Sequence, residues 1–192
     1  MIDIEMQTTE RSRLGEFCLD TFVFGEIFSD HMFSMVYEDG AWRKPEIVPY
    51  GPISIEPGVM TLHYAQMVFE GMKAFRGVDG AIRLFRPDRN ARRLQESCRR
   101  MCIPEIDQDV FIYAVEQLVR ADRDWIPDRP EYALYIRPIV FSAEPHLEVR
   151  PSTRYRFVIM TCPVGTYFKT GDAGLSLRVD DTYARQIGRA HV

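Results

Sequence analysis

Residues 62–94 read LHYAQMVFEGMKAFRGVDGAIRLFRPDRNARRL, and this segment organises the rest of the chain. In residues 64–72, apolar side chains recur at spacings of three and four, which predicts a short amphipathic helix. The alternating runs AFRG and AIRLF then flank Asp79-Gly80, where glycine supplies the positive φ that a hairpin turn requires. A helix followed by a β-hairpin is therefore expected.

A basic helix is expected next. After Pro87, Asp88 is the predicted N-cap of this helix. Backbone N–H groups at a helix start, together with guanidinium groups, can hold a phosphate or a carboxylate. The charge pattern alone favours the simpler interpretation, a solvated basic face. The arginines concerned are Arg89, Arg92, Arg93, Arg99 and Arg100.

Strands and one further helix are predicted on both sides of this segment. Residues 21–50 suggest strands interrupted by a Glu-Asp-Gly turn at 38–40. Apolar residues at i, i+4 and i+8 from position 110 predict a helix that is capped by Asp107 or Asp109 and ended by Pro127.

Two apolar strands are expected in the last third of the chain. Residues 133–142, ALYIRPIVFS, are apolar on both faces, as in a central strand, and RYRFVIMTC is a second strand that ends at Pro163. Arg137 lies inside the first of these strands and needs an acid, a carbonyl or a ligand carboxylate as its partner. Structural pairing is the usual answer. Tyr135 is two residues from Arg137, so the two share a face.

Histidine and cysteine give no sign of a metal site. His31, beside Asp30 on a strand, is expected to be a hydrogen-bonded structural histidine. Cys98 and Cys102 are four apart on the predicted basic helix and are expected to share a face, without the spacing of a zinc site. Buried or half-buried free thiols are the expected state of the cysteines.

Bulk composition is that of an ordinary globular protein. The 192 residues are 46% apolar and 27% charged, enough for one large domain or two small ones. A net charge of −4 argues against nucleic-acid binding. The polar start MIDIEMQTTERSR does not resemble a signal peptide, and no apolar run approaches a membrane span. We expect a cytoplasmic protein without a membrane partner, although the sequence does not separate the cytosol from an organelle.

Four motifs in order carry a resemblance to a known family. They are FGEIFSDHM at 24–32, the segment at 62–94, YIRPIVFSAEPHLEV at 135–149 and CPVGTYF at 162–168. Together they resemble the branched-chain amino-acid aminotransferases, pyridoxal-phosphate enzymes of fold type IV. The motifs span most of residues 22–185.

The resemblance implies an α/β (α+β) fold, a mixed sheet with packed helices that forms the small N-terminal domain of such an enzyme. The implied boundaries are a lead-in at 1–20, the small domain at 21–164, and an interdomain connection with the start of a large domain at 165–186. The implied activity of the full-length homodimer is transfer of the amino group of leucine, isoleucine or valine to 2-oxoglutarate, with pyridoxal 5'-phosphate as cofactor. D-amino-acid transamination and aminodeoxychorismate lysis are the alternatives within fold type IV.

The resemblance also assigns roles to individual residues. Arg93, at the fourth position of Asn-Ala-Arg-Arg, matches the arginine that binds the cofactor phosphate. Arg137 matches the residue that favours the distal carboxylate of the dicarboxylate substrate. Tyr167 matches a mobile aromatic that covers the substrate. The remaining substrate-pocket residues implied by the family are Phe24, Tyr64, Phe69, Tyr135 and Val149.

The Schiff-base lysine of the family has no counterpart. It is expected in a glycine-rich segment after the one matching DDTYAR, and none of the three lysines, Lys44, Lys73 and Lys169, lies in that context. Residues 187–192, IGRAHV, also spell a translated sequencing adapter, so we expect a non-native tail and a protein that continues. The competing hypothesis is a non-catalytic, truncated α/β domain that binds a partner or dimerises.

Overall fold

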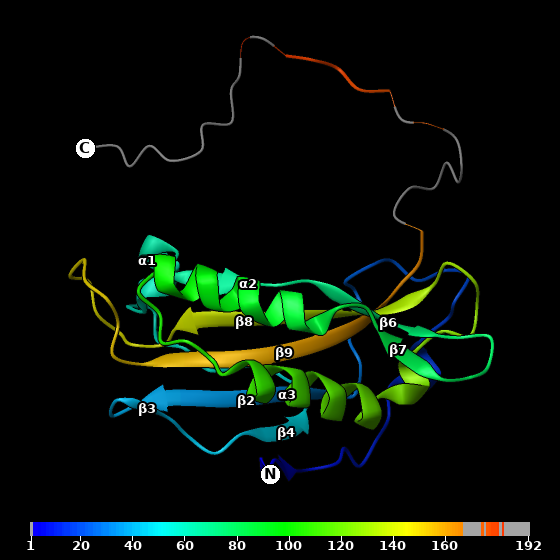
Figure 1. Cartoon of the computed structure of the whole chain (residues 1–192), viewed down its shortest axis with the longest axis horizontal. Coiled ribbons are helices and arrows are strands. Elements are labelled where there is room, and N and C mark those ends of the chain that lie inside the picture. The colour runs from blue at the N-terminus through cyan, green and yellow to red at the C-terminus, as the bar shows by residue number, and fades with distance from the viewer. Residues whose placement is uncertain (1, 167–173, 175, 181, 183–192) are drawn as a thin grey trace.

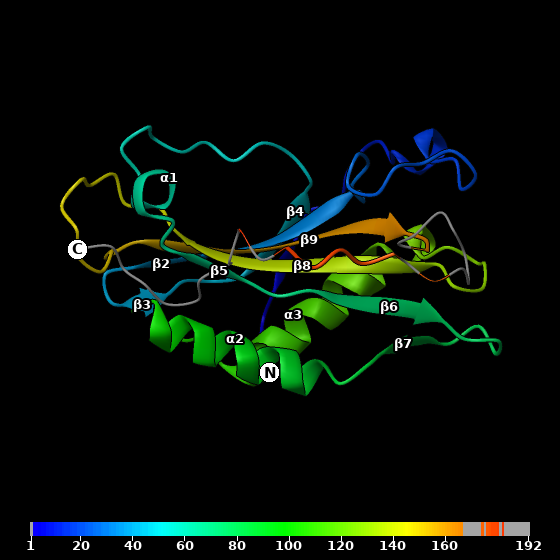
Figure 2. The same ribbon diagram turned by 90° about the horizontal axis from the view of Figure 1, so that it is seen from above.

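The computed structural model describes residues 2–166, 174, 176–180 and 182 of the chain. The described part forms a two-layer arrangement in which a twisted sheet is covered on one face by helices α2 and α3 (Figures 1 and 2). The core lies between these two layers, where the apolar residues of both helices meet those of the central strands. None of the described helices is long and apolar enough to cross a membrane.

The described strands form one nine-stranded sheet in the order β1-β4-β2-β9-β8-β6-β7, with β3 on β2 and β5 on β8. Only β1 and β4 pair in parallel; all the other described pairs are antiparallel, so the sheet is mixed, as predicted. The lead-in therefore contributes an edge strand. The strands are β1 Glu5–Met6, β2 His31–Glu38, β3 Ala41–Trp42, β4 Glu46–Pro49, β5 Met67–Phe69, β6 Met72–Arg76, β7 Ile82–Leu84, β8 Ala133–Ser142 and β9 Tyr155–Val164.

Helix α3, Gln108–Ala121, confirms the predicted second helix. Asp107 is its N-cap and accepts hydrogen bonds from the backbone N–H groups of Asp109 and Val110 at 2.8 and 3.3 Å. The helix ends at Ala121 rather than at Pro127, and a 3-10 turn, Arg123–Trp125, follows it. Its apolar stripe faces the sheet with five buried residues: Phe111, Ala114, Val115, Leu118 and Val119.

The helix predicted for residues 64–72 is wrong. Helix α1 covers only Met60–Tyr64, because Ala65 takes a left-handed conformation with φ of 51° and ends it. The following residues form β5 and β6, which pair with the central strand β8. A ready partner strand therefore overrides the helical spacing of the sequence. The hairpin that follows is confirmed, with Gly80 at φ 77° between β6 and β7.

The basic helix exists as α2, Pro87–Arg100, but two details of its prediction are wrong. Its N-cap is Arg86, in a left-handed conformation, because proline takes the first helical position. Asp88 lies in the first turn and accepts hydrogen bonds from Arg86 at 3.1 Å. Cys98 and Cys102 share no helix face, because α2 ends at Arg100; Cys98 is buried and Cys102 is exposed.

His31 has the structural role expected of it. Its Nδ1 lies 2.7 Å from Asp122 Oδ1, and its Nε2 accepts a hydrogen bond from the backbone N–H of Thr9. Burial raises the pKa of the Asp122 carboxyl, against the opposing effect of His31. This buried pair fastens the start of β2 to the end of α3 and holds the N-terminal segment against both.

Pro138 interrupts an otherwise continuous pairing on β8. Strands β5 and β6 keep one register against it, from Met67 opposite Phe141 to Ala74 opposite Leu134. The N–H of Glu70 donates to the backbone oxygen of Pro138 at 2.9 Å, but proline has no N–H with which to return the second hydrogen bond. The ladder therefore has a gap at Glu70, and the chain there divides into two short strands.

Candidate active site

The candidate site lies on the face of the sheet that is turned away from α2 and α3. Side chains alternate along a strand, so the buried Leu134 and Ile136 of β8 contribute to the helix-covered core, whereas Tyr135 and Arg137 point to the other face. The pairing of β8 with β5 and β6 places Phe69 on that same face. Figure 2 shows this face without either of the two long helices.

Arg137 is held by aromatic groups. Its Nη2 and Nε donate to the hydroxyl oxygen of Tyr135 at 2.7 and 3.2 Å, and its guanidinium lies 4.4 Å from the centre of the Phe69 ring. Phe24 meets the Tyr135 ring edge-on, with 5.2 Å between the ring centres. Four residues from three distant parts of the sequence thus form one contacting group around a half-buried cation.

Neither of the protein partners expected for Arg137, an acid or a backbone carbonyl, is found in the described part of the chain. The contacts of its guanidinium there are the Tyr135 hydroxyl and the two aromatic rings, which carry no formal charge. Within the described residues, structural pairing with an acid therefore does not account for Arg137. A half-buried cation without a carboxylate favours an anionic ligand.

Gly71 makes room for this arrangement. A Cβ atom on Gly71 would lie 2.5 Å from the hydroxyl oxygen of Tyr135 and 3.2 Å from the ring carbon that bears it. Such distances are far inside van der Waals contact, so only glycine lets the Tyr135 ring lean across the neighbouring strand toward Arg137. Sequence reasoning missed this role; the signal was a glycine between two short apolar runs.

Arg93, the predicted phosphate-binding residue, extends from α2 and is 65% exposed. Its Nε and Nη2 donate to the two carboxylate oxygens of Glu70 at 2.5 and 2.6 Å. The Nδ2 of Asn90 donates to the same carboxylate at 2.8 Å. The carboxylate of Glu70 raises the pKa of the Arg93 guanidinium. Sequence reasoning also missed Glu70 and Asn90, since no local pattern links Glu70 to residues on the later helix.

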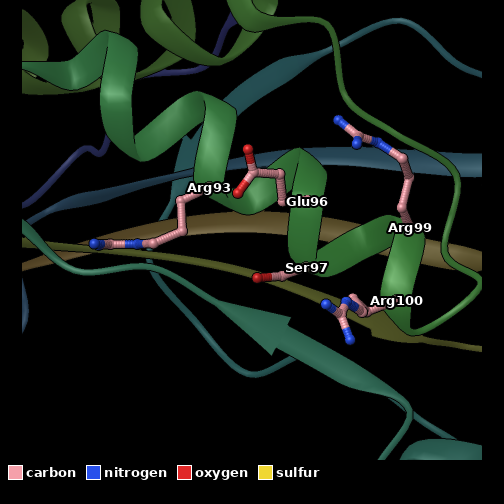
Figure 3. Close-up of a pocket in the computed structure, with 5 residues that line it drawn as sticks. All are labelled: Arg93, Glu96, Ser97, Arg99 and Arg100. Carbon is pink, nitrogen blue, oxygen red and sulfur yellow. The ribbon is translucent and has the colours of Figure 1, made fainter.

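A hollow of about 540 Å³ runs along the surface of α2. Figure 3 shows the guanidinium of Arg93 at one end of it and those of Arg99 and Arg100 at the other. Arg99 is paired with Glu105 at 2.8 Å, and Arg93 is paired with Glu70. The arginines of the helix therefore do not converge on one anion, and Arg93 is the member that is held at the edge of the sheet.

Two predicted pocket residues lie apart from the group around Arg137. Tyr64 ends α1 and donates its hydroxyl proton to the backbone oxygen of Leu147 at 2.5 Å. Val149 lies in the same 143–154 connection and is 79% exposed. Their place in the substrate pocket stays a prediction, as does that of Tyr167, which lies outside the described residues.

Cys162 is a titratable residue on β9, the strand next to the one that carries Tyr135 and Arg137. It pairs with Tyr135 across β8 and β9 and is buried. Burial raises the pKa of its thiol to about 11, although the charge of Arg137 acts in the opposite direction. The thiol is therefore neutral at physiological pH and acts as an apolar wall beside Tyr135. Among the described residues no group of three His, Cys, Asp or Glu side chains is arranged to hold a metal ion.

The fold is that of the N-terminal domain of fold type IV aminotransferases. The branched-chain aminotransferase of Thermoproteus uzoniensis, solved with norvaline, superposes with a TM-score of 0.54 at 25% identity, covering 70% of this chain and 42% of that one. The Escherichia coli branched-chain amino acid aminotransferase gives 0.52 at 20% identity over 68% and 41%. A third such enzyme, solved with pyridoxamine 5'-phosphate, gives 0.52 at 22% identity over 69% and 40%. No family model matches the chain.

By sequence, the chain is similar to branched-chain amino-acid aminotransferases. It is 48% identical to that of Mycobacterium tuberculosis over 164 residues, which are 84% of this chain and 45% of the relative. It is 43% identical to branched-chain-amino-acid aminotransferase 2 of Bacillus subtilis over 187 residues, or 97% and 51%. The chain thus spans about half the length of the curated relatives it matches.

Proposed function

We propose that this chain supplies the substrate-binding face of a branched-chain amino-acid aminotransferase that converts leucine, isoleucine or valine and 2-oxoglutarate to branched 2-oxo acids and glutamate. The observation that carries the proposal is Arg137, a cation between the Phe69 ring and the Tyr135 hydroxyl on an open aromatic face. Sequence similarity to enzymes of that name supports it.

The face suits both substrates of such a reaction. Exposed aromatic rings, among them Phe24 and Phe69, offer apolar walls for a branched aliphatic side chain. The guanidinium of Arg137 offers the charge that the distal carboxylate of 2-oxoglutarate or glutamate requires. One pocket can therefore alternate between an apolar and an acidic side chain, which a transaminase with these two substrates must do.

The chain also fits one part of pyridoxal phosphate. Arg93 presents a guanidinium whose orientation is fixed by a buried carboxylate and whose outer edge is exposed, a donor set suited to a phosphate. The cofactor, when bound, supplies an electron sink for removal of the substrate α-proton. One structural relative was solved with pyridoxamine 5'-phosphate, a form of this cofactor. A homodimer with a role in branched-chain amino-acid biosynthesis belongs to the same proposal.

The test adds, after residue 185, the portion of the Mycobacterium tuberculosis relative that this chain does not cover. The chimaera is expected to bind pyridoxal phosphate with an imine absorbance and to transaminate leucine with 2-oxoglutarate. The 192-residue chain alone is expected to do neither. Turnover of D-alanine or aminodeoxychorismate in place of leucine would favour the alternative fold type IV activities. A folded chimaera without any cofactor absorbance would favour a non-catalytic domain.

The variant Arg137→Gln in that chimaera separates the two half-reactions. Losing a charge-assisted contact of about 1.5–3 kcal/mol should raise KM for 2-oxoglutarate roughly 10- to 100-fold, with a much smaller effect on KM for leucine. Arg120→Gln, on α3 behind the sheet, is the matched control and should change neither. Equal effects on both substrates would contradict the role proposed for Arg137.

A further inference from the structure

Glu70 is placed to control Arg93 from inside the fold. It is the residue next to Phe69 but points to the opposite face, toward α2. Its side chain is only 3% exposed, whereas that of Arg93 is 65% exposed. The buried carboxylate of Glu70 is therefore the fixed partner of the pair, and it determines the orientation of the exposed Arg93 side chain.

Asn90 completes the hold on Glu70. It stands three residues before Arg93 on the same face of α2, and its Nδ2 donates to Glu70 Oε2 at 2.8 Å and to the backbone oxygen of Gly71 at 3.3 Å. Both carboxylate oxygens of Glu70 are thus occupied by donors of one helix. The contact with Arg93 is bidentate, which fixes the plane of the guanidinium as well as its position.

The geometry determines which edge of Arg93 stays available. Glu70 takes the edge formed by Nε and Nη2, so the edge formed by Nη1 and the second Nη2 proton remains for another acceptor. In Figure 3 the side chain extends away from Arg99 and Arg100. An unrestrained arginine would lose much rotamer freedom on binding an anion, and Glu70 removes this freedom in advance.

We infer that Glu70 is a positioning residue for the phosphate group of the cofactor, acting through Arg93. The inference rests on the proposed function. Its negative charge also repels a phosphate, but the carboxylate is buried beneath Arg93, and the phosphate would meet the exposed edge of the guanidinium, where solvent screens its charge. The benefit of a guanidinium held in one orientation therefore outweighs the repulsion between Glu70 and the phosphate. Removal of Glu70 is expected to weaken phosphate binding.

Two variants of the completed chimaera separate charge from placement. Glu70→Gln removes the negative charge but keeps the length of the side chain. Glu70→Asp keeps the charge but shortens the side chain by one methylene group. Both are expected to weaken pyridoxal phosphate at least tenfold in equilibrium dialysis, while the affinity for pyridoxal, which has no phosphate, changes less than twofold. Unchanged or tighter pyridoxal phosphate binding by Glu70→Gln overturns the inference, as does equal weakening of both ligands.

The contact between Glu70 and Arg93 is tested on the 192-residue chain by NMR of the arginine Nε–H signals. Arg93 should give a signal protected from exchange that is lost in Glu70→Gln and retained in Glu96→Gln, which removes the exposed partner of Arg92 instead. An unprotected signal in the wild-type chain overturns the inference without affecting the proposed function. If the wild-type chimaera binds no pyridoxal phosphate, the proposed function fails, and this inference fails with it.

Discussion

Gly71 is the residue whose replacement tests the packing of the site most directly. In Gly71→Ala the new methyl would stand 2.5 Å from the Tyr135 hydroxyl oxygen, so the ring must move and shift the hydroxyl that accepts from Arg137. Overpacking of this kind costs about 1–3 kcal/mol. In urea unfolding of the 192-residue chain, the variant should unfold at a correspondingly lower midpoint concentration of urea than the wild type.

Gly15→Ala is the matched control for that substitution. Nothing lies within 4 Å of a Cβ built on Gly15, and its φ is not positive. The control should unfold within about 0.5 kcal/mol of the wild type, as most surface substitutions do. Equal midpoints for the two variants would mean that Tyr135 is not confined by Gly71.

Glu144 gives a pH-dependent prediction. Arg150, with the backbone N–H of Thr153 and the hydroxyl of Ser152, lowers the pKa of its carboxyl from 4.5 to about 2, against the effect of burial. A lowered pKa stabilises the fold above the unfolded value, and this contribution is lost as the pH falls from about 4.5 toward 2.

The variant Glu144→Gln checks this dependence. It should unfold about 1–2 kcal/mol more easily than the wild type at pH 7 and by a shrinking margin below pH 4.5, because the wild-type carboxylate is then protonated as well. Chemical denaturation at a series of pH values gives the margin. A margin that stays constant down to pH 2 would show that charge at position 144 is irrelevant.

At the residue scale, the sequence predicts what depends on local spacing. Tyr135 and Arg137 share a face because they are two apart on a strand, and the structure confirms this. The contacts of Glu70 with Arg93, and of Phe24 with Tyr135, join positions far apart in the chain. Such contacts depend on how the elements pack, which periodicity does not encode.

At the element scale, the start of α3 depends on one side chain. Asp107 caps two backbone N–H groups, so Asp107→Ala should cost about 1 kcal/mol of stability. Asp88→Ala in α2 is the comparison: Asp88 lies in the first turn, where its exposed carboxylate mainly binds the Arg86 side chain, and its loss should cost only a few tenths of a kcal/mol. Thermal unfolding of both variants measures the difference; a larger loss for Asp88→Ala would reverse the two roles.

Long elements with clear signals were predictable, and short ones were not. The helix behind Asp107, the hairpin at Gly80 and the two long strands β8 and β9 carry local signals, and all of them form. Residues 64–72 carry a helical spacing as well, yet Met67–Phe69 pairs with β8 because hydrogen bonding to a central strand outweighs a weak local preference.

At the scale of the whole molecule, the open face of the sheet determines behaviour in solution. Phe69 and Phe75 lie on this face and are 58% and 40% exposed. Apolar surface of this kind promotes association, so the isolated chain should self-associate as its concentration rises. The double variant Phe69→Thr, Phe75→Thr should shift sedimentation velocity profiles toward the monomer.

Phe85→Thr is the control for that experiment. Phe85 is 80% exposed but lies beyond β7, outside the strands that carry the candidate site. It should leave association nearly unchanged. Association that disappears equally in both variants would show that total exposed apolar area, rather than the open face, is responsible.

The family resemblance predicted the architecture of the molecule but not its two faces. The mixed sheet with packed helices was expected from the resemblance and is confirmed. Which face the helices cover depends on the burial of Leu134 and Ile136 against α2 and α3, and this is a property of the assembled layers. The residues that alternate with Leu134 and Ile136 on β8, among them Tyr135 and Arg137, then form the other face.

The missing hydrogen bond at Pro138 has a mechanical consequence. Strands β5 and β6 are joined to β8 on either side of Glu70, but at Glu70 only one bond ties them to it. The backbone pairing at this edge of the sheet is therefore weakest between Phe69 and Gly71, beside the proposed substrate pocket. In the proposed pocket, a wall that yields there would accommodate side chains of different girth at little elastic cost, while the continuous β8–β9 pairing keeps Arg137 in register.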